Sequence, residues 1–88
     1  MTSKEVVVGH RLGLHARASA RLVRLSESFS SDISLSCANS SSDVEADARS
    51  ILAILLLAAG HGTLVRVRAD GEDEKEAVDA ICEYLVCQ

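Results

Sequence analysis

One histidine stands where it could carry a phosphoryl group. His15 directly precedes a segment of helical periodicity, so the first amides of that helix have no partner within it. These are the amides of Ala16, Arg17 and Ala18, and with the helix dipole they form an anion-binding site. Imidazole titrates near neutral pH and is nucleophilic when neutral, which suits accepting and returning a phosphoryl group. The residues predict a phosphoacceptor at His15, with Arg17 neutralising the added charge through a bidentate contact.

The remaining histidines and the cysteines give weaker signals. On the residues alone, a histidine near a helix start is also typical of a solvated loop or a cap, so that alternative stays open for His15. His10 lies in the loop leading to this position and His61 between two glycines, and we expect no catalytic role for either. None of the three cysteines belongs to a CxxC motif, which favours reduced thiols over a metal site. We expect no metal and no cofactor.

Composition restricts the class of protein. Eighty-eight residues suffice for one domain, which we expect to span residues 1–88. A formal charge of −4 and an aromatic content of 2% argue against nucleic acid as a partner. The longest apolar run, residues 51–59, is far shorter than the ~20 residues of a membrane span, and no signal peptide is visible. These observations predict a cytoplasmic protein without membrane insertion, which we expect to be a monomer.

Hydrophobic periodicity predicts seven elements in the order β-α-β-β-α-β-α. The expected strands are residues 5–8, 33–37, 43–46 and 64–69, and the expected helices are residues 16–29, residues 48–59 and a last helix after Asp70-Gly71. We expect a hairpin turn at residues 38–42 and a helix cap at Asp47. The order indicates an α+β fold with a four-stranded, mostly antiparallel sheet and helices on one face. A ferredoxin-like ligand-binding domain has a similar order, and the strand order would distinguish the two.

Two surface features, an apolar helix and a row of arginines, indicate protein docking. The helix around residues 51–57 is apolar almost all round, so part of it should be exposed, unless this helix is sunk more deeply than a surface helix. Arginines recur along the first helix, which is typical of a solvated face or of a surface for an acidic partner. We predict a docking surface made of Ala20, Arg21, Arg24, Arg49, Ile51, Leu52 and Leu55.

Three segments in order resemble a known family. Gly13-Leu14-His15-Ala16-Arg17 resembles its phosphohistidine motif, Arg49-Ser50-Ile51-Leu52 its regulatory-serine segment, and Gly62-Thr63 with Gly71-Glu72-Asp73-Glu74 its last strand and helix. The family is the histidine-containing phosphocarrier protein HPr of the bacterial phosphoenolpyruvate-dependent sugar phosphotransferase system. The resemblance covers nearly the whole chain. It implies an open-faced β-sandwich and a carrier without turnover of its own. His15 would take a phosphoryl group from enzyme I and pass it to sugar-specific permease (enzyme II) components, supported by Arg17.

The resemblance also implies regulation at Ser50. In some bacteria the matching serine is phosphorylated by an ATP-dependent kinase, so a serine kinase/phosphorylase and a transcriptional regulator are further partners to consider. We place Ser50 in the first turn of the second helix, where a phosphate would put negative charge on the apolar docking surface and weaken docking. A regulatory binding module and a nitrogen-branch paralogue of the family therefore stay open as alternatives.

Two segments depart from the family pattern. Ala18 stands where the family usually has proline, so the helix entry should be slightly looser while offering one more amide donor. Residues 39–42 form a longer turn than the family's tight hairpin and contain no glycine. The first departure should change transfer rates, and the second should leave the site untouched.

Overall fold

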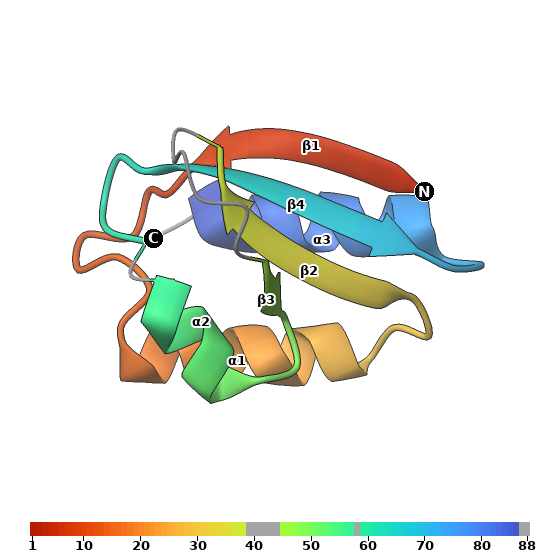
Figure 1. The fold of residues 1–88 in the computed structure, drawn as a ribbon, viewed down its shortest axis with the longest axis horizontal. Coiled ribbons are helices and arrows are strands. Elements are labelled where there is room, and N and C mark those ends of the chain that lie inside the picture. The colour runs from red at the N-terminus through yellow and green to blue at the C-terminus, as the bar shows by residue number, and fades with distance from the viewer. Residues whose placement is uncertain (39–44, 58, 87–88) are drawn as a thin grey trace.

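Four antiparallel strands form one open sheet. The computed structural model describes residues 1–38, 45–57 and 59–86. The strands are β1 (Thr2–Val7), β2 (Asp32–Cys37), β3 (Ala46–Asp47) and β4 (Leu64–Asp70). Their order is β1-β4-β2-β3, so β4 lies between β1 and β2 (Figure 1). A ferredoxin-like sheet places its first and third strands in parallel at the centre, so this order excludes that alternative.

One face of the sheet is apolar because the strands alternate. On β4, Val65, Val67 and Ala69 are buried, whereas Arg66 between them is exposed. On β2, Ile33 and Leu35 are buried in the same core. This period of two places every second side chain against the helices and leaves the others in water. The predicted strand faces are confirmed.

Three helices cover the apolar face of the sheet. They are α1 (Ala16–Glu27), α2 (Ile51–Leu57) and α3 (Glu74–Val86). In Figure 1, α3 lies behind the sheet along β1 and β4, while α1 and α2 lie together below it. The buried residues of α3 recur at helical spacing and are Ala77, Val78, Ile81, Cys82 and Leu85. The predicted α+β open-faced sandwich is confirmed.

Two boundaries differ at the sheet edges. β1 spans Thr2–Val7 instead of residues 5–8, because its backbone pairs with β4 from Thr2 onward. Two of its polar side chains also contact α3: the Thr2 hydroxyl donates to Glu74, and Lys4 Nζ lies 2.5 Å from Asp79 Oδ1. The predicted hairpin is confirmed by the antiparallel pairing of β2 with β3. However, residues 43 and 44 of the expected strand and most of the expected turn lie outside the described residues.

The start of α2 also differs from the prediction. Asp47 does not cap this helix: its Oδ1 accepts the Arg49 N–H at 2.9 Å and its carbonyl accepts the Ser50 N–H at 3.0 Å, which makes a turn. Ser50 is the N-cap instead, because its Oγ accepts the Ala53 N–H at 3.3 Å. The helix therefore begins at Ile51, three residues later than expected. Among the described residues, all helices are too short or too polar to cross a bilayer.

Candidate functional site

His15 is the N-cap of α1. Its backbone is extended, with φ −71° and ψ 178°, and its carbonyl accepts the Ser19 N–H at 2.8 Å, which is the first bond of the helix. The side chain makes no capping hydrogen bond and is exposed. The imidazole is therefore accessible from solvent at the mouth of the helix.

The helix offers donors for an anion next to this ring. Because the first helical bond uses the Ser19 amide, the amides of Ala16, Arg17 and Ala18 have no partner inside α1. The first turn of α1 contains no acidic residue. The positive end of the helix dipole is therefore not compensated by a carboxylate, and an added phosphoryl group would meet free N–H groups there.

The loop before His15 is fixed by glycine and by main-chain bonds. Gly13 has φ +68°, and a Cβ at this position would lie 2.7 Å from the Ala59 carbonyl oxygen, so only glycine fits. Leu14 is buried, and its amide donates to the same carbonyl at 2.9 Å. From the other side, Ser19 Oγ donates to the Leu14 carbonyl at 3.0 Å. The Gly-Leu pair thus explains how the chain enters α1 at His15.

The cationic side chains of the sheet and those of α1 differ in their ion pairing. On the sheet and its edges, Lys4, Arg49, Arg66 and Arg68 each form an ion pair with a carboxylate. Within the part of the chain that the structure describes, no ion pair includes Arg17, Arg21 or Arg24, all of which are exposed on α1. We call these three the α1 arginines. Their charge is available to an acidic partner near His15.

An exposed apolar surface lies on α2, which packs beside α1. Ile54 is the fully buried residue of this helix, whereas Leu52 is 64% exposed and Leu56 is 76% exposed. The exposure predicted from the sequence is confirmed, and the alternative of a deeply sunk helix is wrong. The exposed residues, here called the α2 apolar face, are Ile51, Leu52, Leu55 and Leu56. Leu56 was missing from the predicted set, although it belongs to the same apolar run.

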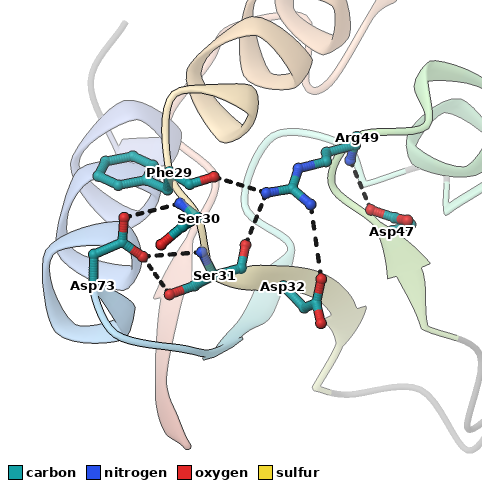
Figure 2. A network of polar contacts seen from close by, with 7 residues as sticks. All are labelled: Phe29, Ser30, Ser31, Asp32, Asp47, Arg49 and Asp73. Atoms are coloured by element: carbon teal, nitrogen blue, oxygen red, sulfur yellow. Dashed lines mark hydrogen bonds and ion pairs between the residues drawn. The ribbon is translucent and has the colours of Figure 1, made fainter.

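Arg49 takes a different place from the one predicted. Its Nη2 donates to the carbonyls of Phe29 and Ser31, at 2.7 and 3.0 Å, and Nη1 lies 3.7 Å from Asp32 (Figure 2). The guanidinium therefore fixes the turn between α1 and β2 and is not a free edge of the α2 apolar face. Because Arg49 is nevertheless exposed, its place in the docking surface stays a prediction.

The same turn is held from the other side by Asp73. Its carboxylate accepts the Ser30 and Ser31 amides, at 2.9 and 3.0 Å, and the Ser31 hydroxyl (Figure 2). The Ser31 hydroxyl bond and then the Ser30 amide bond hold the pKa of Asp73 below its usual value. With Arg49 opposite, the network positions the end of α1 relative to the helix that carries the apolar face.

Sequence reasoning missed two contacts of Tyr84 near the site. His10 Nε2 lies 2.7 Å from the Tyr84 carbonyl, and the Tyr84 hydroxyl donates to the Ala18 carbonyl at 3.0 Å. No local pattern could have shown them, because Tyr84 follows His10 by 74 residues. His61, in contrast, is exposed between its two glycines.

Comparison with known proteins identifies the family. The family model described as "PTS HPr component phosphorylation site" matches residues 2–86. The chain belongs to the HPr family. Phosphocarrier protein HPr of Xylella fastidiosa is 46% identical over 85 residues, which cover 97% of this chain and 91% of that protein. The HPr family consists of phosphocarriers of the phosphotransferase system, which are not catalytic enzymes.

Two further comparisons support and refine this membership. The crystal structure of HPr from Bacillus anthracis superposes with a TM-score of 0.86 at 31% identity, covering 96% of this chain and 95% of that one. Phosphocarrier protein NPr of Proteus mirabilis is 40% identical over 78 residues, which cover 89% of this chain and 83% of that protein. The HPr family therefore includes relatives of both names at similar identity.

Proposed function

We propose that this member of the HPr family accepts a phosphoryl group on His15 from phosphorylated enzyme I and passes it to sugar-specific enzyme II components. The observation that carries the proposal is the exposed His15 ring at the N-cap of α1, beside three amides without helical partners. An exposed nucleophile with preformed anion donors suits a group that is received from one protein and given to another.

The transfer needs one nucleophilic ring nitrogen. Its lone pair attacks the phosphorus of the phosphorylated donor, a nitrogen–phosphorus bond forms, and the bond between the donor and phosphorus breaks with its electron pair left on the donor. The second ring nitrogen keeps its proton, so the product is a phosphoimidazolium. The amides of Ala16, Arg17 and Ala18 donate to the phosphoryl oxygens, and the Arg17 guanidinium neutralises their charge. Transfer to the acceptor reverses these steps.

Docking is assigned to the surface around the site. The α2 apolar face supplies desolvated contact area, and the α1 arginines supply long-range attraction to an acidic partner. The proposed docking residues are those predicted from the sequence, Ala20, Arg21, Arg24, Arg49, Ile51, Leu52 and Leu55, and we include Leu56 because it is exposed on the same helix. The packing of α1 against α2 supports the proposal that a partner that reaches His15 also contacts this surface.

Ser50 is proposed as a regulatory site. Its hydroxyl is the N-cap of α2 and adjoins the exposed Ile51 and Leu52. A phosphate there adds about −1.5 to −2 charges at the edge of the α2 apolar face, which opposes burial of that face by a partner. A serine kinase/phosphorylase would then set the strength of docking, and a transcriptional regulator could bind the phosphorylated form.

A second candidate is the nitrogen branch of the family. The 40% identity to NPr of Proteus mirabilis favours it as a specific alternative to the sugar branch. The chemistry at His15 would be the same in both branches, since the same ring and amides hold the phosphoryl group. The branches differ in the donor and acceptor proteins that dock.

Phosphoryl uptake tests the function and the branch together. The chain is mixed with radiolabelled phosphoenolpyruvate and either enzyme I or its nitrogen-branch counterpart, and then with the matching acceptors. We expect an acid-labile label on the wild type and on His61→Gln, and none on His15→Ala. Faster labelling by enzyme I supports the sugar branch, and faster labelling by the counterpart supports the nitrogen branch. Label retained by His15→Ala would refute the carrier assignment.

A further inference from the structure

The last turn of α3 lies against the loop that leads to His15. The Gly9 amide donates to the Leu85 carbonyl at 2.9 Å, and a Cβ at Gly9 would lie 2.1 Å from the Val86 carbonyl oxygen. His10 Nε2 lies 2.7 Å from the Tyr84 carbonyl, which can only accept, so this nitrogen carries the proton. The rings of His10 and Tyr84 are 5.0 Å apart, tilted by 49°. The loop therefore donates to two carbonyls in the last turn of α3.

The Tyr84 side chain extends from this turn to the first turn of α1. Its ring is half-buried against the core, and its hydroxyl donates to the Ala18 carbonyl at 3.0 Å. Burial raises the pKa of the Tyr84 phenol, so the hydroxyl keeps the proton that it donates. One residue thus joins the loop before His15, through its carbonyl, to the helix after His15, through its hydroxyl.

The bond to Ala18 orients a peptide group that holds His15. The Ala18 carbonyl and the Ser19 amide belong to one planar peptide group. The Ser19 amide donates to the His15 carbonyl at 2.8 Å, the first bond of α1. Fixing the carbonyl side of this plane fixes the N–H side, and with it the angle at which the chain turns from His15 into the helix.

The first turn of α1 has few other restraints. His15 provides no side-chain capping bond, and residues 16–18 include no proline that would fix φ. Among the side chains of the described residues, Ser19 and Tyr84 are those that bond to main-chain carbonyls of this turn, at Leu14 and Ala18. Within α1 the Ala18 carbonyl is also the helical acceptor for the Leu22 amide, so the Tyr84 hydroxyl adds a second restraint to this peptide group.

We infer that Tyr84 is a positioning residue for phosphoryl transfer on His15, acting through the peptide group of Ala18 and Ser19. This inference rests on the proposed function. Tyr84 does not touch the phosphoryl group. It holds the ring and the free amides in the relative geometry that transfer requires, and His10 holds the end of α3 from which Tyr84 acts.

The test removes one oxygen atom. Tyr84→Phe keeps the ring in the core and deletes only the hydroxyl, and we expect kcat for uptake from phosphorylated enzyme I to fall about threefold to tenfold. KM should change less than about twofold, because the α2 apolar face and the α1 arginines are untouched. The matched control is Ser26→Ala, which deletes a hydroxyl bonded to the Leu22 carbonyl at 2.8 Å in the same helix, far from His15. It should leave kcat unchanged.

A second readout follows the peptide group directly. We expect Tyr84→Phe, but not Ser26→Ala, to accelerate hydrogen exchange of the Ser19 amide several-fold relative to amides in the middle of α1. Wild-type kcat in Tyr84→Phe, an equal fall of kcat in both variants, or an unchanged Ser19 exchange rate would overturn the inference. If the wild type takes up no phosphoryl group, the proposed function fails, and the exchange measurement still decides whether Tyr84 holds the turn.

Discussion

The proposed phosphoacceptor depends mainly on main-chain groups. The ring of His15 makes no side-chain capping bond, and the donors beside it are amides that any residue except proline provides. Side chains contribute by placing that main chain: Gly13 by its positive φ, Leu14 by burial and Ser19 by its bond to the Leu14 carbonyl. This division explains how two small alanines, at positions 16 and 18, can belong to the proposed phosphate-binding turn.

Two carboxyl groups away from the site have lowered pKa values in the folded protein, and these predict how stability depends on pH. The Ser31 hydroxyl and the Ser30 amide lower the pKa of Asp73, and the Thr2 hydroxyl and the N-terminal amine lower that of Glu74 to about 2. A carboxyl with a lower pKa in the folded state stabilises the fold above its unfolded pKa and loses this contribution as pH falls through the folded value. We expect the free energy of unfolding to fall as pH decreases from about 4.5 toward 2.

Urea unfolding at a series of pH values measures this effect. Glu74→Gln removes one of the two titrating groups and should flatten the decrease, while Glu83→Gln, an exposed residue on the same helix, should reproduce the wild-type curve. Stability that stays constant across this pH range, or equal slopes for wild type and Glu74→Gln, would contradict the assignment.

Elements with clear periodicity could be predicted from the sequence, and their ends could not. Alternation in residues 33–37 and 64–69 places β2 and β4, because burial on one face imposes a period of two. The predicted start of α2 was wrong because Asp47 and Ser50 are both good N-cap residues. Which of the two caps the helix depends on the contacts of Arg49. Its guanidinium is bonded to the turn between α1 and β2, which holds residues 47–50 in a turn outside the helix.

Substitution of Ser50 separates its two roles in α2. Ser50→Ala removes the N-cap acceptor and should cost about 1 kcal/mol of unfolding free energy, whereas Ser50→Asp supplies another acceptor and should keep most of it. Only the aspartate adds charge beside the α2 apolar face, so it should raise KM for phosphorylation by enzyme I more than the alanine does. Thermal unfolding and uptake kinetics measure the two effects. An equal KM for both variants would remove the regulatory proposal.

Contacts between distant elements account for what sequence reasoning missed at the site. The His10 ring contacts α3, and the Tyr84 hydroxyl contacts α1. Both contacts depend on the sheet, which places the two helices on one face. Arg49 looked like the edge of an apolar patch because its two carbonyl partners, at Phe29 and Ser31, lie in a different turn. His15, in contrast, could be located from the sequence, because its setting is the local start of a helix.

At the scale of the whole molecule, the distribution of charge complements the proposed site. The formal charge is −4, yet the α1 arginines, on the helix that begins directly after His15, form no ion pair among the described residues, while Arg66 and Arg68 on the sheet are paired. A negative molecule with a positive surface around one residue should attract an acidic partner in one orientation.

This arrangement predicts a salt dependence of docking. Between ~0.05 and ~0.5 M salt the apparent association rate with enzyme I should fall about tenfold, because screening shortens the range of attraction. Arg21→Gln should lower the rate at low salt and weaken the salt dependence. Arg66→Gln, which changes the net charge equally but lies on the far face of the sheet, should do neither. Stopped-flow mixing provides the rates, and identical behaviour of the two variants would refute the docking surface.

NMR spectra of the isotope-labelled chain, recorded before and after phosphorylation by enzyme I, test whether His15 carries the phosphoryl group. If the phosphoryl group is carried on His15 and held by the start of α1, the ring resonances of His15 and the amide resonances of Ala16, Arg17 and Ala18 shift together, and those of the His61 ring do not. Phosphorylation at another residue, or on His15 without any change in these amides, would contradict a phosphoryl group on His15 that is held by the start of α1.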